Sequence, residues 1–164
     1  MIVVADTSPL NYLIQIDCDH FLPRIFGRIL VPVAVMQELG HPDSPPKIKE
    51  WLSQVPQWID VNAVELAPDS RLAFLGKGER EAIQLAELRN AELLLIDERK
   101  GRQEAGRRGL KTTGTLGVLI SAGDLGMIDP ERAYRRMLAE TTFRTSPALE
   151  SRFLERTRAS GNRS

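Results

Sequence analysis

Residues 1–6 of the chain read Met1-Ile2-Val3-Val4-Ala5-Asp6, a short apolar run that ends in a carboxylate. A second run of this kind, Leu93-Leu94-Leu95-Ile96, ends in Asp97. Short, continuous apolar runs are typical of parallel strands that are buried on both faces. Because parallel strands end along one edge of their sheet, the two acids are predicted to lie at the same edge.

Outward from these two runs, strand-like and helix-like stretches alternate along the chain. Strands are predicted at residues 1–5, 28–31, 58–61, 91–96 and 110–113. Helices are predicted at residues 9–16, 33–39, 45–54, 79–90, 98–108, 115–123, 130–140 and 147–158, before a polar tail at 160–164. Ser8 and Thr115 are candidate N-caps. The alternation indicates a three-layer α/β/α fold with a central, mainly parallel sheet.

Composition limits the class of protein. With 164 residues, 42% of them hydrophobic, the chain is large enough for one core. No apolar run approaches about 18 residues, and Asp6 follows the start without a basic segment, so neither a membrane span nor a signal peptide is supported. A cytoplasmic protein without membrane association is expected. One cysteine and two histidines do not make a familiar zinc site, so oxygen must hold any metal.

Four carboxylates fall where an apolar run meets the start or end of a helix: Asp6, Glu38, Glu79 and Asp97. Two unit charges about 4 Å apart repel by roughly 4 kcal/mol at an effective dielectric near 20, so a cluster stays ionised only beside a cation. Oxygen ligands favour Mg²⁺ or Mn²⁺, which bind phosphate oxygens and acidify a bound water. The set predicts phosphodiester hydrolysis. Asp6 or Asp97 alone is explained equally well as a helix cap, and the alternative for Glu79 and Glu81 is that they complement the helix dipole.

The helix at residues 79–90 offers two acids, Glu79 and Glu81, whose side chains point to nearly opposite sides. Glu79 lies in the first turn and shares a face with the small and apolar residues Ala82 and Ile83, which are expected to press on the sheet. We therefore predict Glu79 as the third ligand, with Glu81 as the alternative.

Short hydroxyl residues stand next to the proposed strand ends, where they could bind a water, the metal or a phosphate. They are Thr7, Ser8, Thr113 and Thr115. Thr115 precedes a helix and is explained equally well as its N-cap.

A nucleic-acid partner would have to be attracted locally, because the formal net charge is zero. The window from Arg99 to Lys111 holds six basic residues against the single acid Glu104. Arg99 and Arg102 lie one helical turn apart just after Asp97, where they could bind phosphates. The alternative is an ordinary solvated helix face.

With these residues in place, the chain resembles the PIN-domain nucleases, and among them the bacterial and archaeal toxins of the VapC type. The resemblance rests on the segments 4–10, 37–39, 78–83, 95–98 and 114–117. It implies a metal-dependent endoribonuclease in which the four acids, with Thr115 beside them, hold one or two Mg²⁺ or Mn²⁺ ions. Glu79, unlike Glu81, keeps the family's usual interval before the fourth acid, although the family often has Asp there. Glu98 supplies the second acid that relatives often carry after the fourth.

The resemblance also implies a nuclease domain at residues 1–145. Residues 146–164 would be a C-terminal helix and tail that belong to the same domain or bind a partner. A small antitoxin and a homodimer are further implications. The alternatives are a structure-specific DNA nuclease, a non-catalytic PIN module that binds RNA or protein, and a phosphoacceptor module on a flavodoxin-like sheet. The last would need adjacent acids after the first strand, where Asp6 is followed by Thr7 and Ser8.

Overall fold

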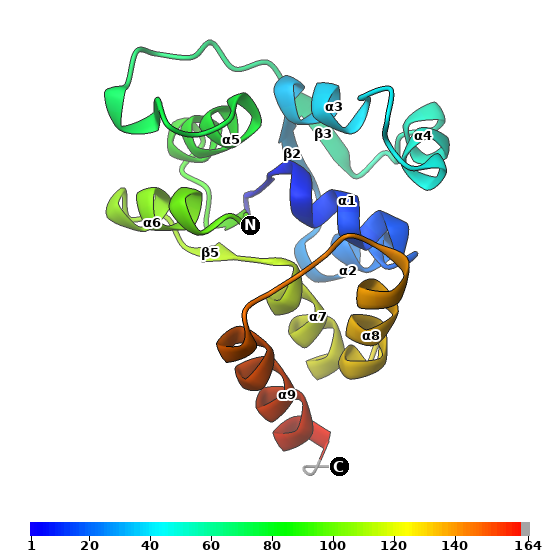
Figure 1. The fold of residues 1–164 in the computed structure, drawn as a ribbon. Coiled ribbons are helices and arrows are strands. Elements are labelled where there is room, and N and C mark those ends of the chain that lie inside the picture. Colours follow the sequence, from blue (N-terminus) through cyan, green and yellow to red (C-terminus); the bar gives the residue numbers. More distant parts are fainter. Residues whose placement is uncertain (162–164) are drawn as a thin grey trace.

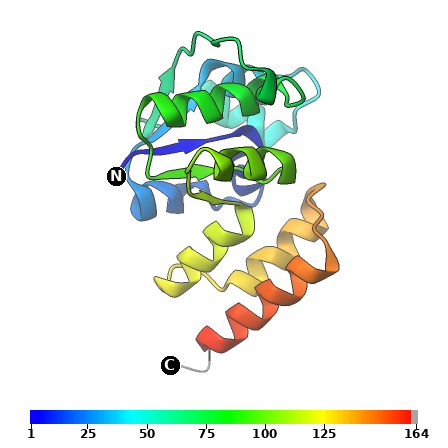
Figure 2. The same ribbon diagram turned by 90° about the vertical axis from the view of Figure 1, so that its left-hand side faces the viewer.

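The computed structural model describes residues 1–161, which form a five-stranded sheet between two layers of helices (Figures 1 and 2). The strands are β1 (Val3–Ala5), β2 (Ile29–Pro32), β3 (Ile59–Asn62), β4 (Leu93–Leu95) and β5 (Thr112–Thr113). Their order across the sheet is β3-β2-β1-β4-β5, and every neighbouring pair is parallel. The predicted three-layer α/β/α fold is confirmed.

The helices of the described residues agree with the predicted ones to within a few residues. They are α1 (Thr7–Gln15), α3 (Val33–Leu39), α4 (Pro46–Ser53), α5 (Lys77–Leu88), α6 (Arg99–Arg107), α7 (Thr115–Asp124), α8 (Pro130–Glu140) and α9 (Pro147–Gly161). Part of the predicted tail is therefore helical, and residues 162–164 lie outside the described residues.

Three short helical segments were missed: η1 (Asp19–Phe21), α2 (Leu22–Phe26) and η2 (Ser70–Leu72). Each is too short to show a helical period in the sequence.

The apolar run at the N-terminus becomes the central strand. Val3, Val4 and Ala5 are fully buried, with β2 on one side of β1 and β4 on the other. Val3 and Ala5 enter a core shared with α1, α7 and α8, whereas Val4 enters a second core shared with α5 and α6. Because successive side chains of a strand point to opposite faces, a strand covered by helices on both faces must be apolar throughout.

The order of the strands reverses at β1. From β1 the chain moves outward to β2 and β3, and it then returns to form β4 and β5 on the other side. Ala5 pairs with Leu95, and the Asp6 backbone N–H donates a hydrogen bond to the Leu95 carbonyl at 2.9 Å. Asp6 and Asp97 therefore leave neighbouring strands at the switch point, where open α/β sheets place their ligands.

The last three helices extend from one end of the sheet (Figure 2), with α7 in contact with both α8 and α9. Aromatic side chains hold α9 in place, because the buried Phe153 ring lies 5.0 Å from the ring of Tyr134 on α8. Within the part of the chain that the structure describes, no helix combines the length and apolar character that a membrane crossing requires.

Candidate functional site

Asp6 lies at the centre of the candidate site. It directly follows β1, its side chain is 3% exposed, and its Oδ1 atom is buried without a hydrogen-bond partner among the described residues. Burial raises the pKa of Asp6 to about 7, against a hydrogen bond from the Thr7 backbone that lowers it. The negative charges of Glu79, Glu38 and Asp97 raise this pKa further. A bound proton or cation would offset the free-energy cost of this buried negative charge.

The N-cap position of α1 belongs to Asp6, and the prediction of Ser8 as the N-cap is wrong. Helix α1 begins at Thr7, so Pro9 is its third residue. Proline is tolerated throughout the first turn because the N–H groups there have no partner within the helix, and Pro9 therefore did not define the start.

Glu38, in the last turn of α3, is held by two donors. It accepts a hydrogen bond from the Thr7 hydroxyl and another, at 3.0 Å, from the backbone N–H of Gly78 at the start of α5. A Cβ atom at position 78 would stand 2.6 Å from Glu38 Oε2, so only glycine permits this approach. Glu79 follows Gly78 and is half-buried, and burial first, then the charges of Glu98 and Glu38, raise its pKa.

Asp97 is held in the same way at the start of α7. Its two carboxylate oxygens accept hydrogen bonds from the Thr115 backbone N–H and hydroxyl, both at 2.7 Å. Burial raises the pKa of Asp97, while the hydrogen bonds from Thr115 and the positive charge of Arg102 lower it. Thr115 is fully buried and is the first residue of α7, with Gly114 as the N-cap. The alternative reading of Thr115 as the N-cap is therefore wrong, because its hydroxyl serves Asp97.

The structure separates the two glutamates of α5. Glu81 is 4% exposed and accepts a hydrogen bond at 3.2 Å from the backbone N–H of Ala34, in the first turn of α3. The N-cap of α3 is Pro32, which offers no side-chain acceptor, so Glu81 caps that helix from outside. Glu79, in contrast, is among the charges that act on Asp6. The assignment of Glu79 as a ligand stays a prediction.

Across residues 1–161, no three His, Cys, Asp or Glu side chains stand together as a ready-made metal cluster. Glu38 and Asp97 are instead turned toward donors of the protein. Magnesium keeps several waters and usually binds through one or two carboxylates, so it does not require such a cluster. A hydrated ion fits these residues, because it would satisfy the unpaired Oδ1 of Asp6 and offset the surrounding negative charge.

Part of the predicted basic patch is structural. The side chain of Arg108 is 14% exposed and forms ion pairs with Asp69 and Glu87, both at 2.7 Å, and with Glu104 at 3.1 Å. Arg107 also pairs with Glu104, whose own side chain is buried. The expectation that the whole window faces RNA is therefore wrong for Arg108, which ties α6 to α5 and to the segment before it. Arg107, in contrast, pairs only within α6, and its side chain is 69% exposed. Charge counting could not show that the single acid of the window faces inward.

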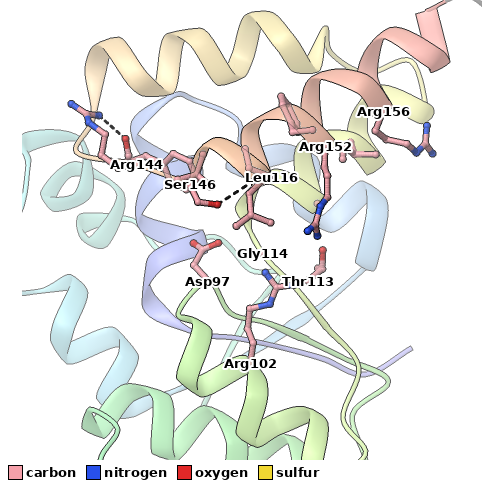
Figure 3. A pocket seen from close by; sticks show the side chains of 15 residues that line it. Asp97, Arg102, Thr113, Gly114, Leu116, Arg144, Ser146, Arg152 and Arg156 are labelled. Atoms are coloured by element: carbon pink, nitrogen blue, oxygen red, sulfur yellow. Dashed lines mark hydrogen bonds between the residues drawn. The ribbon is translucent and has the colours of Figure 1, made fainter.

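A groove of about 450 Å³ opens beside Asp97, between α7 and α9 (Figure 3). Arg102 lines it together with Asp97, whereas Arg99 does not. Arg152 and Arg156 reach it from α9. This groove was not predicted from the sequence, although the spacing of Arg152 and Arg156 by one helical turn is a signal that could have pointed to it.

Comparison with known families agrees with this arrangement. A family model described as a PIN domain matches residues 2–159, a range that contains all five strands and all four acids. No curated protein matches the chain.

Proposed function

The chain belongs to the PIN-domain family, whose members are generally metal-dependent nucleases, and on this premise we propose that it is an endoribonuclease that hydrolyses phosphodiester bonds of RNA. The observation that carries the proposal is the buried carboxylate of Asp6 at the switch point of the sheet, with Glu38, Glu79 and Asp97 around it. A site that concentrates negative charge and leaves Oδ1 of Asp6 unpaired suits a divalent cation.

We assign a Mg²⁺ or Mn²⁺ ion to the four carboxylates. When bound, the ion would supply charge neutralisation and acidify the water that attacks phosphorus. The protein holds the carboxylates in place for it: Thr115 orients Asp97, and Thr7 with the Gly78 N–H orients Glu38.

The substrate side of the site combines hydroxyl and guanidinium groups. Arg102 lies close enough to Asp97 to lower its pKa, so its guanidinium can bind a phosphate next to the carboxylates. Arg99 at the start of α6, and Thr7 and Ser8 at the start of α1, are proposed as further contacts. We propose RNA, and not flap DNA, as the substrate because the chain resembles the VapC-type toxins.

The same resemblance supports a biological role. We propose that the protein acts in the cytoplasm as the toxin of a toxin-antitoxin pair, as a homodimer that a small antitoxin neutralises. Residues 146–164 are proposed to belong to the same functional unit as residues 1–145. Co-expression with the product of a small neighbouring reading frame is the test: relief of growth inhibition supports the pair, and unchanged growth in all combinations contradicts it.

The enzymatic proposal predicts that Asp6→Asn reduces cleavage of single-stranded RNA to background. The variant loses the carboxylate at the centre of the acidic cluster, which consists of Asp6, Glu38, Glu79 and Asp97. Cleavage of labelled RNA is measured with Mg²⁺, with Mn²⁺ and with EDTA, and the wild-type chain is expected to be active only with metal. Asp60→Asn is the matched control, because Asp60 lies in the edge strand β3, outside the cluster.

Full activity of Asp6→Asn would overturn the mechanism. Cleavage of flap DNA but not of RNA by the wild-type chain would overturn the substrate and favour the DNA nuclease alternative.

A further inference from the structure

The groove beside Asp97 carries positive charge, in contrast to the acidic cluster at its end. Figure 3 shows α9 and the segment before it on one side, with Asp97 and Arg102 facing them. Its volume of about 450 Å³ lies within the range of ligand sites. Among the described residues that line it, Asp97 is the one acid, and four are basic: Arg102, Arg144, Arg152 and Arg156.

These arginines differ in how far the protein already satisfies them. Arg156 pairs with Asp124 at 2.8 Å, and Arg144 donates to backbone carbonyl oxygens, including that of Phe143. Arg152 is exposed, and its side chain has neither a hydrogen bond nor an ion pair with the described part of the chain. A guanidinium group with no carboxylate of its own, in a groove lined by other cations, is available to an anion.

The groove also offers apolar surface. Leu116 and Ile120 of α7 line it, and Leu149 of α9 does so with 44% of its surface exposed. Single-stranded nucleic acid presents both matching features, since its phosphates are charged and its unpaired bases expose flat apolar faces. A duplex hides those faces in its stack and would leave the apolar part of the groove uncovered.

The spacing along α9 fits a strand of this kind. Arg152 and Arg156 are four residues apart, which separates them by about 6 Å along the helix axis, comparable with successive phosphates of an extended strand. Asp97 belongs both to the groove and to the acidic cluster. A strand that lies in the groove therefore leads directly to the carboxylates.

We propose that the groove between α7 and α9 binds the single-stranded RNA segment next to the cleaved phosphate, with Arg152 as a substrate-binding residue. This inference rests on the proposed function. It places the specificity for unpaired RNA in the C-terminal helix, outside the α/β sheet itself.

The test compares the wild-type chain with Arg152→Ala and Arg158→Ala. Arg158 lies on the same helix, carries the same charge and does not line the groove. Binding of a fluorescent single-stranded RNA is followed by anisotropy in EDTA over a range of salt concentrations, and cleavage is measured separately with Mg²⁺.

Arg152→Ala is expected to weaken binding by about tenfold. It should also flatten the dependence of log K on log salt by about 0.7, as expected for one lost phosphate contact. Arg158→Ala should resemble the wild-type chain in both.

Two results separate the inference from the function on which it rests. If the wild-type chain cleaves RNA and Arg152→Ala binds it with the same affinity and salt dependence, the groove inference is overturned and the proposed function stands. If the wild-type chain neither binds nor cleaves RNA, the proposed function has failed, and the inference with it. A poly-glutamate peptide is the second probe: binding of that peptide through Arg152, with RNA binding independent of it, would make the groove a protein-docking site and overturn the inference.

Discussion

Glu79 and Glu81 stand two positions apart on α5 and have different partners. Glu79 raises the pKa of Asp6, whereas Glu81 accepts a hydrogen bond from the Ala34 N–H. Sequence spacing predicted that only one of them reaches the strand ends, because residues two apart on a helix point to nearly opposite sides. Spacing could not predict that the other would cap α3, because its partner is 47 positions away in the sequence.

Because of these partners, replacement of glutamate by glutamine is predicted to have different effects at the two positions. Glu79→Gln is expected to reduce RNA cleavage strongly and to leave the stability of the metal-free protein equal or higher, because a charge leaves a repulsive cluster. Glu81→Gln retains an oxygen acceptor for Ala34 and should keep most of the activity. Glu81→Ala leaves that buried N–H unpaired and should destabilise the fold by about 1–3 kcal/mol. Cleavage rates and urea unfolding curves check both expectations, and greater activity loss in Glu81→Gln than in Glu79→Gln would reverse the assignment.

Helices α3 and α5 are joined at two places. Glu81 of α5 meets the first turn of α3, and Gly78 at the start of α5 meets Glu38 in the last turn of α3. The two contacts place the helices antiparallel, which brings the end of one and the start of the other to the same edge of the sheet. The position of Glu38 therefore depends on how closely α5 approaches it.

The close approach at Gly78 predicts the effect of a single methyl group. In Gly78→Ala the new Cβ would stand 2.6 Å from Glu38 Oε2, and the exposed carboxylate of Glu38 would have to turn away. We expect lower RNA cleavage with stability within about 1 kcal/mol of the wild-type value, because alanine favours the helix by about that amount. Gly106→Ala in α6 is the matched control, since a Cβ there meets nothing within 4 Å. Equal cleavage by both variants would show that the approach of α5 to Glu38 does not matter.

For the whole molecule, the buried charge of Asp6 couples stability to pH and to metal. Its pKa is raised from 3.8 to about 7 in the folded state, so the folded chain prefers the protonated form. The contribution of protonated Asp6 to the stability of the fold is therefore complete below about pH 4 and is lost as the pH rises through about 7. The loss amounts to about 4 kcal/mol, from about three pKa units at roughly 1.4 kcal/mol each.

Thermal unfolding of the wild-type chain and Asp6→Asn in EDTA checks this coupling. Asp6→Asn should be the more stable protein at pH 8, and its advantage should shrink at pH 5, because the wild-type carboxyl is then largely protonated in the folded state. Added Mg²⁺ should raise the melting temperature of the wild-type chain at pH 8 more than that of the variant, since an ion that binds only the folded state stabilises it. An advantage that does not depend on pH would show that Asp6 is not the buried charge responsible.

Much of this architecture is visible in the sequence alone. The strands are visible because a strand buried on both faces must be apolar throughout, as Val3, Val4 and Ala5 are. The acids at the strand ends are visible because parallel strands end along one edge. The N-caps of α1 and α7 were predicted wrongly, at Ser8 and Thr115. Proline and threonine can occupy several positions of a first turn, so Pro9 and Thr115 do not define where these helices begin.

Local patterns of polarity along the chain were enough to predict the α/β alternation, the apolar strand at residues 1–5 and the positions of the four acids. The three-dimensional structure was needed to show which strand lies at the switch point, that Glu81 caps α3, and which arginines form ion pairs within the protein. It also decided that Arg152 of α9 opens onto the same groove as Asp97. These features depend on contacts between residues far apart in the chain, and local polarity does not specify which distant partner a side chain meets.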